Sequence, residues 1–158
     1  MSSEKILVLG IGNVLMEDEG AGVEVVRRLE EQSLPENVDI LDGGTGGFHL
    51  LAQLSGYKVI IMVDATLDDD EEGNIKLTEP KFASDFPKAL SAHDIGLKDL
   101  VESLILLNEF PKIYLFTISI KHFHNVSMQL SPSIQNAIPK TAEKVVELIN
   151  QLNQSLSK

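Results

Sequence analysis

Three acidic residues stand in a row near the N-terminus, between two glycine-containing segments: Glu17, Asp18 and Glu19. Carboxylates at the start of a helix can simply balance the helix dipole, and Asp18 could act as a plain N-cap. One or two carboxylates are explained in this way, whereas three consecutive ones also suit a site for a cation. At this point a structural role and a ligand role are both open.

Two further residues could complete such a site. Asp64 ends the apolar run 59–63, where a carboxylate is costly unless something pairs with it. His93 lies in S-A-H-D, a capping box that predicts a helix start, and the helix dipole there favours a neutral, metal-binding imidazole. The structural alternatives are a capping contact for Asp64 and a partly exposed first-turn position for His93. Together with Glu19 they make an O,O,N set that suits nickel or zinc and leaves coordination positions open.

The segment before the acidic turn begins like a dinucleotide-binding fingerprint but does not continue as one. Gly10 and Gly12 are present, but Leu15 stands where the third glycine is needed. Asp42 is thirty residues beyond Gly12, whereas the ribose-binding acid should follow after about 20. Each carboxylate would also repel a phosphate charge about 5 Å away by nearly 1 kcal/mol even in water. The turn is therefore built for a cation.

The order of predicted elements explains how distant residues could meet. Strand patterns, apolar throughout or alternating, occupy residues 6–9, 38–41, 59–63, 74–78 and 113–120. Helical stripes of apolar residues occupy 23–29, 48–54, 95–104 and 138–156. This alternation predicts an α/β domain with a mostly parallel sheet and helices on both faces. Ligands collect at the carboxyl ends of such strands, where Glu19, Asp64 and His93 fall.

Composition narrows the class of protein. The 158 residues suit one domain, 1–158, and the absence of cysteine excludes disulfides, thiolate metal sites and a cysteine nucleophile. With no signal peptide and no apolar stretch of about 20 residues, we expect a cytoplasmic protein without a membrane span. The net charge of -11 disfavours nucleic acid and favours cations or neutral and basic surfaces.

Four motifs carry a family resemblance: G-I-G-N-V-L-M-E-D-E-G-A-G-V, L-D-G-G-T-G-G, V-D-A and S-A-H-D-I-G-L. In this order they resemble the maturation endopeptidases of nickel–iron hydrogenases. E-F-P from Glu109 and L-S-P from Leu130 extend the likeness along nearly the whole chain. The likeness is weakest between Thr66 and Leu90.

The resemblance implies both a fold and an activity. The fold would be a three-layer α/β/α sandwich around a mostly parallel, five-stranded twisted sheet. The activity would be removal of the C-terminal extension from the hydrogenase large-subunit precursor after nickel insertion, by a monomer. Carried over by motif, Glu19, Asp64 and His93 would recognise the nickel of the substrate, with zinc or cadmium as surrogates. The ion would assist as a Lewis acid at the scissile carbonyl.

A second group of residues would hold the substrate chain. Asp42, Gly43, Gly44 and Thr45 are expected to border the cleft, where backbone amides could bind the peptide; the alternative is a tight strand-to-helix turn. Neither G-x-S-x-G nor H-E-x-x-H occurs in the chain, so the sequence assigns no nucleophile.

The chain departs from its relatives after the strand at 113–120. Lys121, His122, Phe123 and His124 stand where relatives often carry Gln or Glu beside Pro, and Gln129 where many have Gly. H-x-H on a strand puts both rings on one face and could bind a metal ion. Surface decoration is the favoured interpretation.

Two other functions fit parts of the pattern. A phosphoreceiver-like module without peptidase activity would use the acidic turn, Asp64, Thr117 or Ser119, and Lys121. Receivers place their acidic pair directly at the end of the first strand, and their Thr and Lys on two different strands, whereas one strand carries both here. A general zinc peptidase of the same fold is the second alternative.

Overall fold

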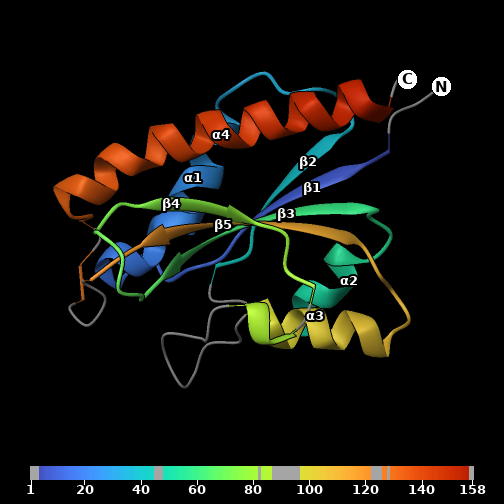
Figure 1. Ribbon diagram of the computed structural model, residues 1–158, viewed down its shortest axis with the longest axis horizontal. Helices are drawn as coiled ribbons and strands as arrows, with labels where there is room; N and C mark the ends of the chain where they lie inside the picture. The colour runs from blue at the N-terminus through green and yellow to red at the C-terminus, as the bar shows by residue number, and fades with distance from the viewer. Residues whose placement is uncertain are drawn as a thin grey trace.

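The computed structural model describes residues 4–44, 48–81, 83–86, 97–121, 126–127 and 129–156. Figure 1 shows a central sheet with helices on both of its faces. The sheet has five strands in the order β2-β1-β3-β5-β4. The predicted three-layer α/β/α architecture is therefore confirmed.

All strands but one run parallel. The parallel strands are β1 (Ile6–Gly10), β2 (Val38–Asp42), β3 (Val59–Thr66) and β5 (Lys112–Ser119), and β4 (Ile75–Thr78) pairs antiparallel with β5. β1 is buried along its whole length because helices cover both faces of the sheet. β4 lies at the edge and is mostly exposed, as its alternating sequence predicts.

The four α-helices in the described part of the chain divide between the two faces. In Figure 1, α1 (Ala21–Glu30) and α4 (Pro132–Leu156) lie on one face, and α2 (Leu51–Leu54) and α3 (Leu97–Leu106) lie on the other. Each pair closes its own hydrophobic core against the sheet. In the described ranges, no helix is both long and apolar enough to cross a membrane.

Two glycines bring the acidic turn against the carboxyl ends of the central strands. A Cβ atom on Gly22 would overlap the carbonyl oxygens of Val63 and Ile11, so α1 begins in direct contact with β3 and with the residue after β1. A Cβ atom on Gly12, whose φ is +151°, would overlap the carbonyl oxygen of Glu19. The chain between Gly12 and Glu19 therefore folds back onto the end of β1.

The end of one strand differs from expectation, and one predicted helix start lies outside the described residues. β3 does not stop before Asp64 but continues to Thr66, because β5 supplies a pairing partner over this whole length, with Thr117 opposite Asp64. The S-A-H-D capping box lies outside the described residues, and α3 is described from Leu97. Asp64 thus lies inside the ladder between β3 and β5 instead of following the strand, one residue beyond the end of the pairing between β3 and β1.

Tyr57 should make stability fall at high pH. Its hydroxyl donates a 2.6 Å hydrogen bond to Asp39 Oδ2, and burial, helped by this bond, raises the pKa of Tyr57 from 10.0 to about 12. The folded state thus holds the phenol proton more tightly than the unfolded chain does. The stability that the protonated Tyr57 contributes is therefore fully present below pH 10 and is lost as the pH rises through 12. Tyr57→Phe should lower the free energy of unfolding by about 1 kcal/mol at pH 8 and remove that loss. Urea unfolding across this pH range measures both effects.

The chain offers a matched control, since it has two tyrosines. Tyr114→Phe keeps the bond between Tyr57 and Asp39 and should therefore keep the loss of stability above pH 10. Equal pH profiles for the wild type and Tyr57→Phe would contradict the assignment.

Candidate functional site at the carboxyl edge of the sheet

The acidic turn forms a short 3-10 helix (η1, Glu17–Gly20) directly before α1. Asp18 is 0% and Glu19 5% exposed, which is the opposite of a solvated charge run. Glu17 has a φ of 49°, a left-handed conformation that side chains other than glycine rarely adopt and that often occurs at functional sites. The turn therefore holds two buried carboxylates in a defined backbone.

Asp18 has a structural partner far along the chain. Its Oδ1 accepts a hydrogen bond from the Ser131 backbone N–H and its Oδ2 one from the Ser131 hydroxyl, both at 2.7 Å. Ser131 directly precedes Pro132, the first residue of α4, so Asp18 joins the acidic turn to the start of that helix. Asp18 does not cap the following helix, the structural alternative that the sequence left open, because no side-chain hydrogen bond caps η1 or α1.

Removing the Asp18 carboxylate should destabilise the fold. Asp18→Ala leaves the N–H and O–H of Ser131 without their acceptor at a buried position, and an unpaired buried donor costs about 1–3 kcal/mol. We expect the free energy of unfolding, measured by urea titration, to fall by about 2 kcal/mol. Glu24→Ala is the control, because Glu24 makes an exposed ion pair with Arg27, a kind of pair that contributes little. Equal losses for the two variants would contradict this role.

Glu19 and Asp64 lie at the same end of the sheet. η1 and β3 are in contact, and Glu19 precedes Gly22, whose Cα lies against the carbonyl of Val63. Asp64 is the next residue of β3, half-buried, and its Oδ1 accepts a 2.9 Å hydrogen bond from the Ala65 N–H. The close contact between α1 and β3 thus places Glu19 and Asp64 at the same end of the sheet.

The third predicted ligand, His93, lies outside the described residues. In the part of the chain that the structure describes, no group of three His, Asp or Glu side chains could hold a metal ion. Asp64 and α3 nonetheless lie on the same face of the sheet. Met62 packs in the core beneath α2 and α3, and Asp64, two residues further, belongs to the same face. α3, described from Leu97, covers that face.

The predicted substrate-binding segment packs beside the acidic turn. Gly12 donates its N–H to the carbonyl of Gly44 at 2.6 Å. Asp42 Oδ1 accepts from the Gly44 N–H at 2.9 Å, and its Oδ2 pairs with Arg27 at 3.4 Å. Asp42, Gly43 and Gly44 thus form the tight turn that was the structural alternative. A role for these residues in substrate binding stays a prediction. Thr45 lies outside the described residues.

β5 places two hydroxyl residues on the face of Asp64. Thr117 pairs with Asp64 across the ladder, and Ser119 pairs with Thr66. Ser119 is 1% exposed, and its Oγ has no hydrogen-bond partner in the described structure. The sequence pointed to Thr117 and Ser119 only as parts of a phosphoreceiver-like pocket. Their position beside Asp64 depends on the register between β3 and β5, which the sequence of one strand does not reveal. Lys121 follows β5 and is exposed, whereas His122, Phe123 and His124 lie outside the described residues.

Residues of the two short family motifs have structural partners. Ser131 of L-S-P binds Asp18, as described above. Glu109 of E-F-P lies at the opposite end of the sheet, where its Oε1 accepts hydrogen bonds from the Ser55 hydroxyl at 2.7 Å and the Gly56 N–H at 3.2 Å. L-S-P therefore anchors the acidic turn next to Glu19, whereas E-F-P holds elements together at the far end of the sheet. Gln129 is exposed and donates its N–H to the Ser127 hydroxyl.

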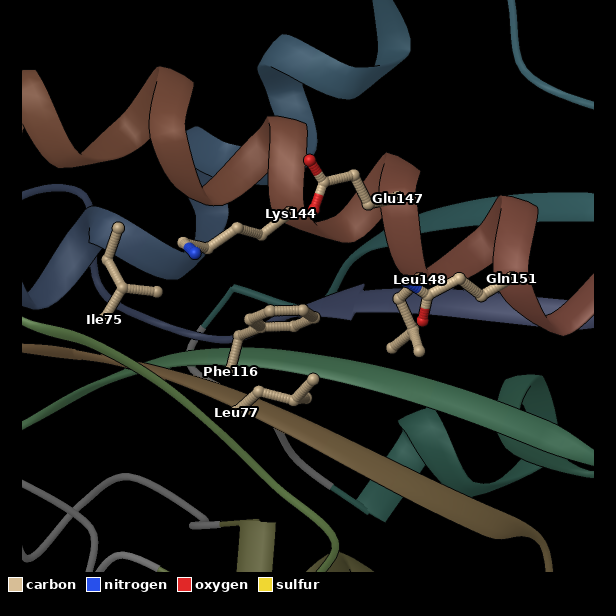
Figure 2. Close-up of a pocket in the computed structure, with 7 residues that line it drawn as sticks. All are labelled: Ile75, Leu77, Phe116, Lys144, Glu147, Leu148 and Gln151. Atoms are coloured by element: carbon tan, nitrogen blue, oxygen red, sulfur yellow. The ribbon is translucent and has the colours of Figure 1, made fainter.

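Hollows elsewhere on the molecule are lined by other residues. One cavity of about 160 Å³ lies between α4 and the edge of the sheet. Figure 2 shows Phe116 at its floor, with Leu148 and Lys144 reaching toward it from the helix. Two more, of about 310 and 150 Å³, lie near Phe110. The candidate site is therefore the open carboxyl edge of the sheet and none of these cavities.

Comparison with known proteins places the chain in one family. The model of the hydrogenase maturation protease family matches residues 23–148. The chain is 33% identical over 150 residues to the hydrogenase 2 maturation protease of Escherichia coli (strain K12), covering 93% of this chain and 92% of that protein. It is 31% identical to the hydrogenase expression/formation protein HupD of Thiocapsa roseopersicina, covering 95% of this chain and 70% of that protein.

Solved structures agree with this assignment. The hydrogenase maturating endopeptidase HybD from E. coli has a TM-score of 0.83 and 32% identity to this chain, with 93% of each chain covered. A [NiFe] hydrogenase maturation protease, HycI from Thermococcus kodakarensis, has the same fold, with a TM-score of 0.76 and 24% identity. The chain therefore belongs to the hydrogenase maturation proteases.

Proposed function

We propose that this protein is an endopeptidase that removes the C-terminal extension of a nickel–iron hydrogenase large-subunit precursor after nickel insertion. One observation carries the proposal beyond family membership. The buried carboxylate of Glu19 and the half-buried carboxylate of Asp64 lie at the same carboxyl edge of the sheet. This is the edge at which parallel α/β sheets bind their ligands.

The donor chemistry fits a nickel ion carried by the substrate. Carboxylate oxygens and imidazole nitrogen are ligands of divalent transition-metal ions, and two carboxylates can bind the same ion. Glu19, Asp64 and His93 would supply three ligands and leave positions for ligands from the precursor. Cleavage would then follow only when the precursor brings its nickel, so the enzyme would inspect its substrate before cutting it. Zinc or cadmium should be able to occupy the same ligands.

The proposal also includes the compartment, the oligomeric state and the segment that holds the peptide. The absence of cysteine from the chain suits a reducing compartment, and we propose that the protein works in the cytoplasm as a monomer. The D-G-G-T segment, Asp42 to Thr45, would contribute backbone amides to the bound peptide, because its described part packs against Gly12 at the edge of the acidic turn.

The test compares two forms of one precursor, with and without nickel. We expect the wild-type protein to shorten the nickel-loaded precursor, measured by mass spectrometry, and to leave the nickel-free form intact. His93→Ala should slow the reaction by about a hundredfold, in the range of ligand-shell substitutions at metal sites. Equal cleavage of both forms would refute nickel recognition, and no cleavage of either would refute the activity.

Two control reactions address the other functions. Acetyl phosphate would label Asp64 in a receiver-like module and should leave this protein unlabelled. Unrelated peptides with added zinc would be cut by a general zinc peptidase and should remain intact here.

A further inference from the structure

Two large apolar side chains are exposed beside the acidic turn. Leu15 is 52% and Val126 80% exposed. A short parallel bridge joins their segments: Ser127 donates its N–H to the carbonyl of Leu15, and Glu17 donates its N–H to the carbonyl of Ser127, both at 2.8 Å. Met16 is the bridge partner of Ser127. In this register Leu15 stands opposite Val126, and paired residues of neighbouring strands share a face. Leu15 and Val126 are therefore neighbouring exposed apolar residues on the two bridged segments, here called the Leu15–Val126 pair.

Folding does not account for this pair. Neither side chain belongs to either hydrophobic core cluster of the described residues, and both give up the gain from burial. The bridge between Met16 and Ser127 nevertheless holds the two segments side by side. Leu15 lies two residues before Glu17, whose backbone has a positive φ. Ordered, exposed apolar groups rimmed by polar residues mark interaction surfaces.

The surroundings of the pair are acidic. In Figure 1 the carboxyl edge is the left end of the sheet, where α4 begins. Among the described residues there, ten acidic side chains face three basic ones: Glu17, Asp18, Glu19, Asp42, Asp64, Asp68, Asp69, Asp70, Glu71 and Glu72 against Arg27, Lys76 and Lys121. Two of the three basic groups already pair with these carboxylates, Arg27 with Asp42 and Lys76 with Asp68 and Asp70. Negative charge therefore predominates at this end of the molecule and favours a basic partner.

We propose that the Leu15–Val126 pair and the acidic groups around it form the surface on which the large-subunit precursor docks. The matching surface of the precursor is an apolar spot ringed by lysine and arginine. This inference rests on the proposed function and adds where and how that substrate is held. A few side chains near the centre of an interface supply most of its affinity, whereas the surrounding charges steer the encounter and set its salt dependence.

The first experiment removes the apolar pair. Steady-state cleavage of the nickel-loaded precursor and direct titration of precursor binding are measured with Leu15→Ser/Val126→Ser. We expect KM and Kd to rise by about tenfold or more, with kcat and thermal unfolding unchanged. The matched control is Leu106→Ser/Phe110→Ser, because Leu106 and Phe110 are 86% and 71% exposed but lie at the opposite end of the sheet. The control should keep the wild-type KM and Kd.

The second experiment removes charge without touching the proposed ligands. Asp69 and Glu71 are exposed, and Asp69→Asn/Glu71→Gln should raise Kd at low salt and weaken its rise with added salt. The control is Glu30→Gln/Glu31→Gln, which removes the same charge from the far end of α1. Its salt dependence should match that of the wild type.

The outcomes separate the two proposals. Normal cleavage with unchanged KM and Kd in the Leu15/Val126 variant overturns the docking surface and leaves the proposed function standing. Binding that depends on Leu15 and Val126 without any cleavage by the wild type supports the surface and overturns the activity. Concentration-dependent self-association that this variant abolishes, without precursor binding, would assign the pair to a second copy and also overturn the proposal.

Discussion

Glu19→Gln is expected to abolish release of the C-terminal extension from the nickel-loaded precursor, with a loss of rate of about two orders of magnitude or more. Glutamine keeps the size of the side chain at this buried position, where Glu19 is 5% exposed, but removes the negative charge. A cation bound as proposed would lose one carboxylate ligand, while the close contact with Gly12 involves only the backbone of Glu19 and is kept. Initial rates are measured by mass spectrometry of the precursor.

Glu24→Gln is the matched control for this variant. It makes the same chemical change five residues further on, at an exposed side chain that pairs with Arg27. Its cleavage rate should equal that of the wild type. Both variants should also show wild-type thermal unfolding. Cleavage at the wild-type rate by Glu19→Gln would remove Glu19 from the proposed ligands.

Asp64→Asn is expected to have an effect of similar size. Asp64 sits inside β3 with Thr117 paired opposite, so the strand ladder should keep the backbone in place. Asparagine can still accept, through its amide oxygen, the hydrogen bond that Asp64 Oδ1 receives from the Ala65 N–H. It loses the negative charge, and an NH2 donor replaces the second carboxylate oxygen. We expect the cleavage rate to fall by about two orders of magnitude.

Two comparisons make the Asp64 prediction specific. Asp68→Asn changes a carboxylate just beyond β3 that pairs with Lys76. Because Asp68 is one of the acidic groups around the Leu15–Val126 pair, this variant can bind the precursor more weakly, but it should keep the wild-type kcat. The double variant Glu19→Gln/Asp64→Asn should be no slower than the slower single variant, because groups that act together on one ion are strongly non-additive. Losses that multiply would show that Glu19 and Asp64 act on separate steps.

The sequence by itself determined the layers and the order of the elements. Buried strands and amphipathic helices record burial in their apolar periodicity, so the pattern of β1 and the stripe of α1 were predictable from neighbouring residues alone. The topology rule for parallel sheets then predicted that Glu19 and Asp64 would lie at one edge. Both belong to the same described edge in the structure.

Only the tertiary structure decided which distant residues pair. Asp18 binds Ser131 across 113 residues of chain, although its local sequence equally suits an N-cap. The continuation of β3 through Asp64 depends on the length of β5, and the Leu15–Val126 pair depends on a bridge between two loops. Local propensity describes each segment by itself, whereas the partner of a buried carboxylate or of an exposed side chain is set by how segments far apart in the chain come together.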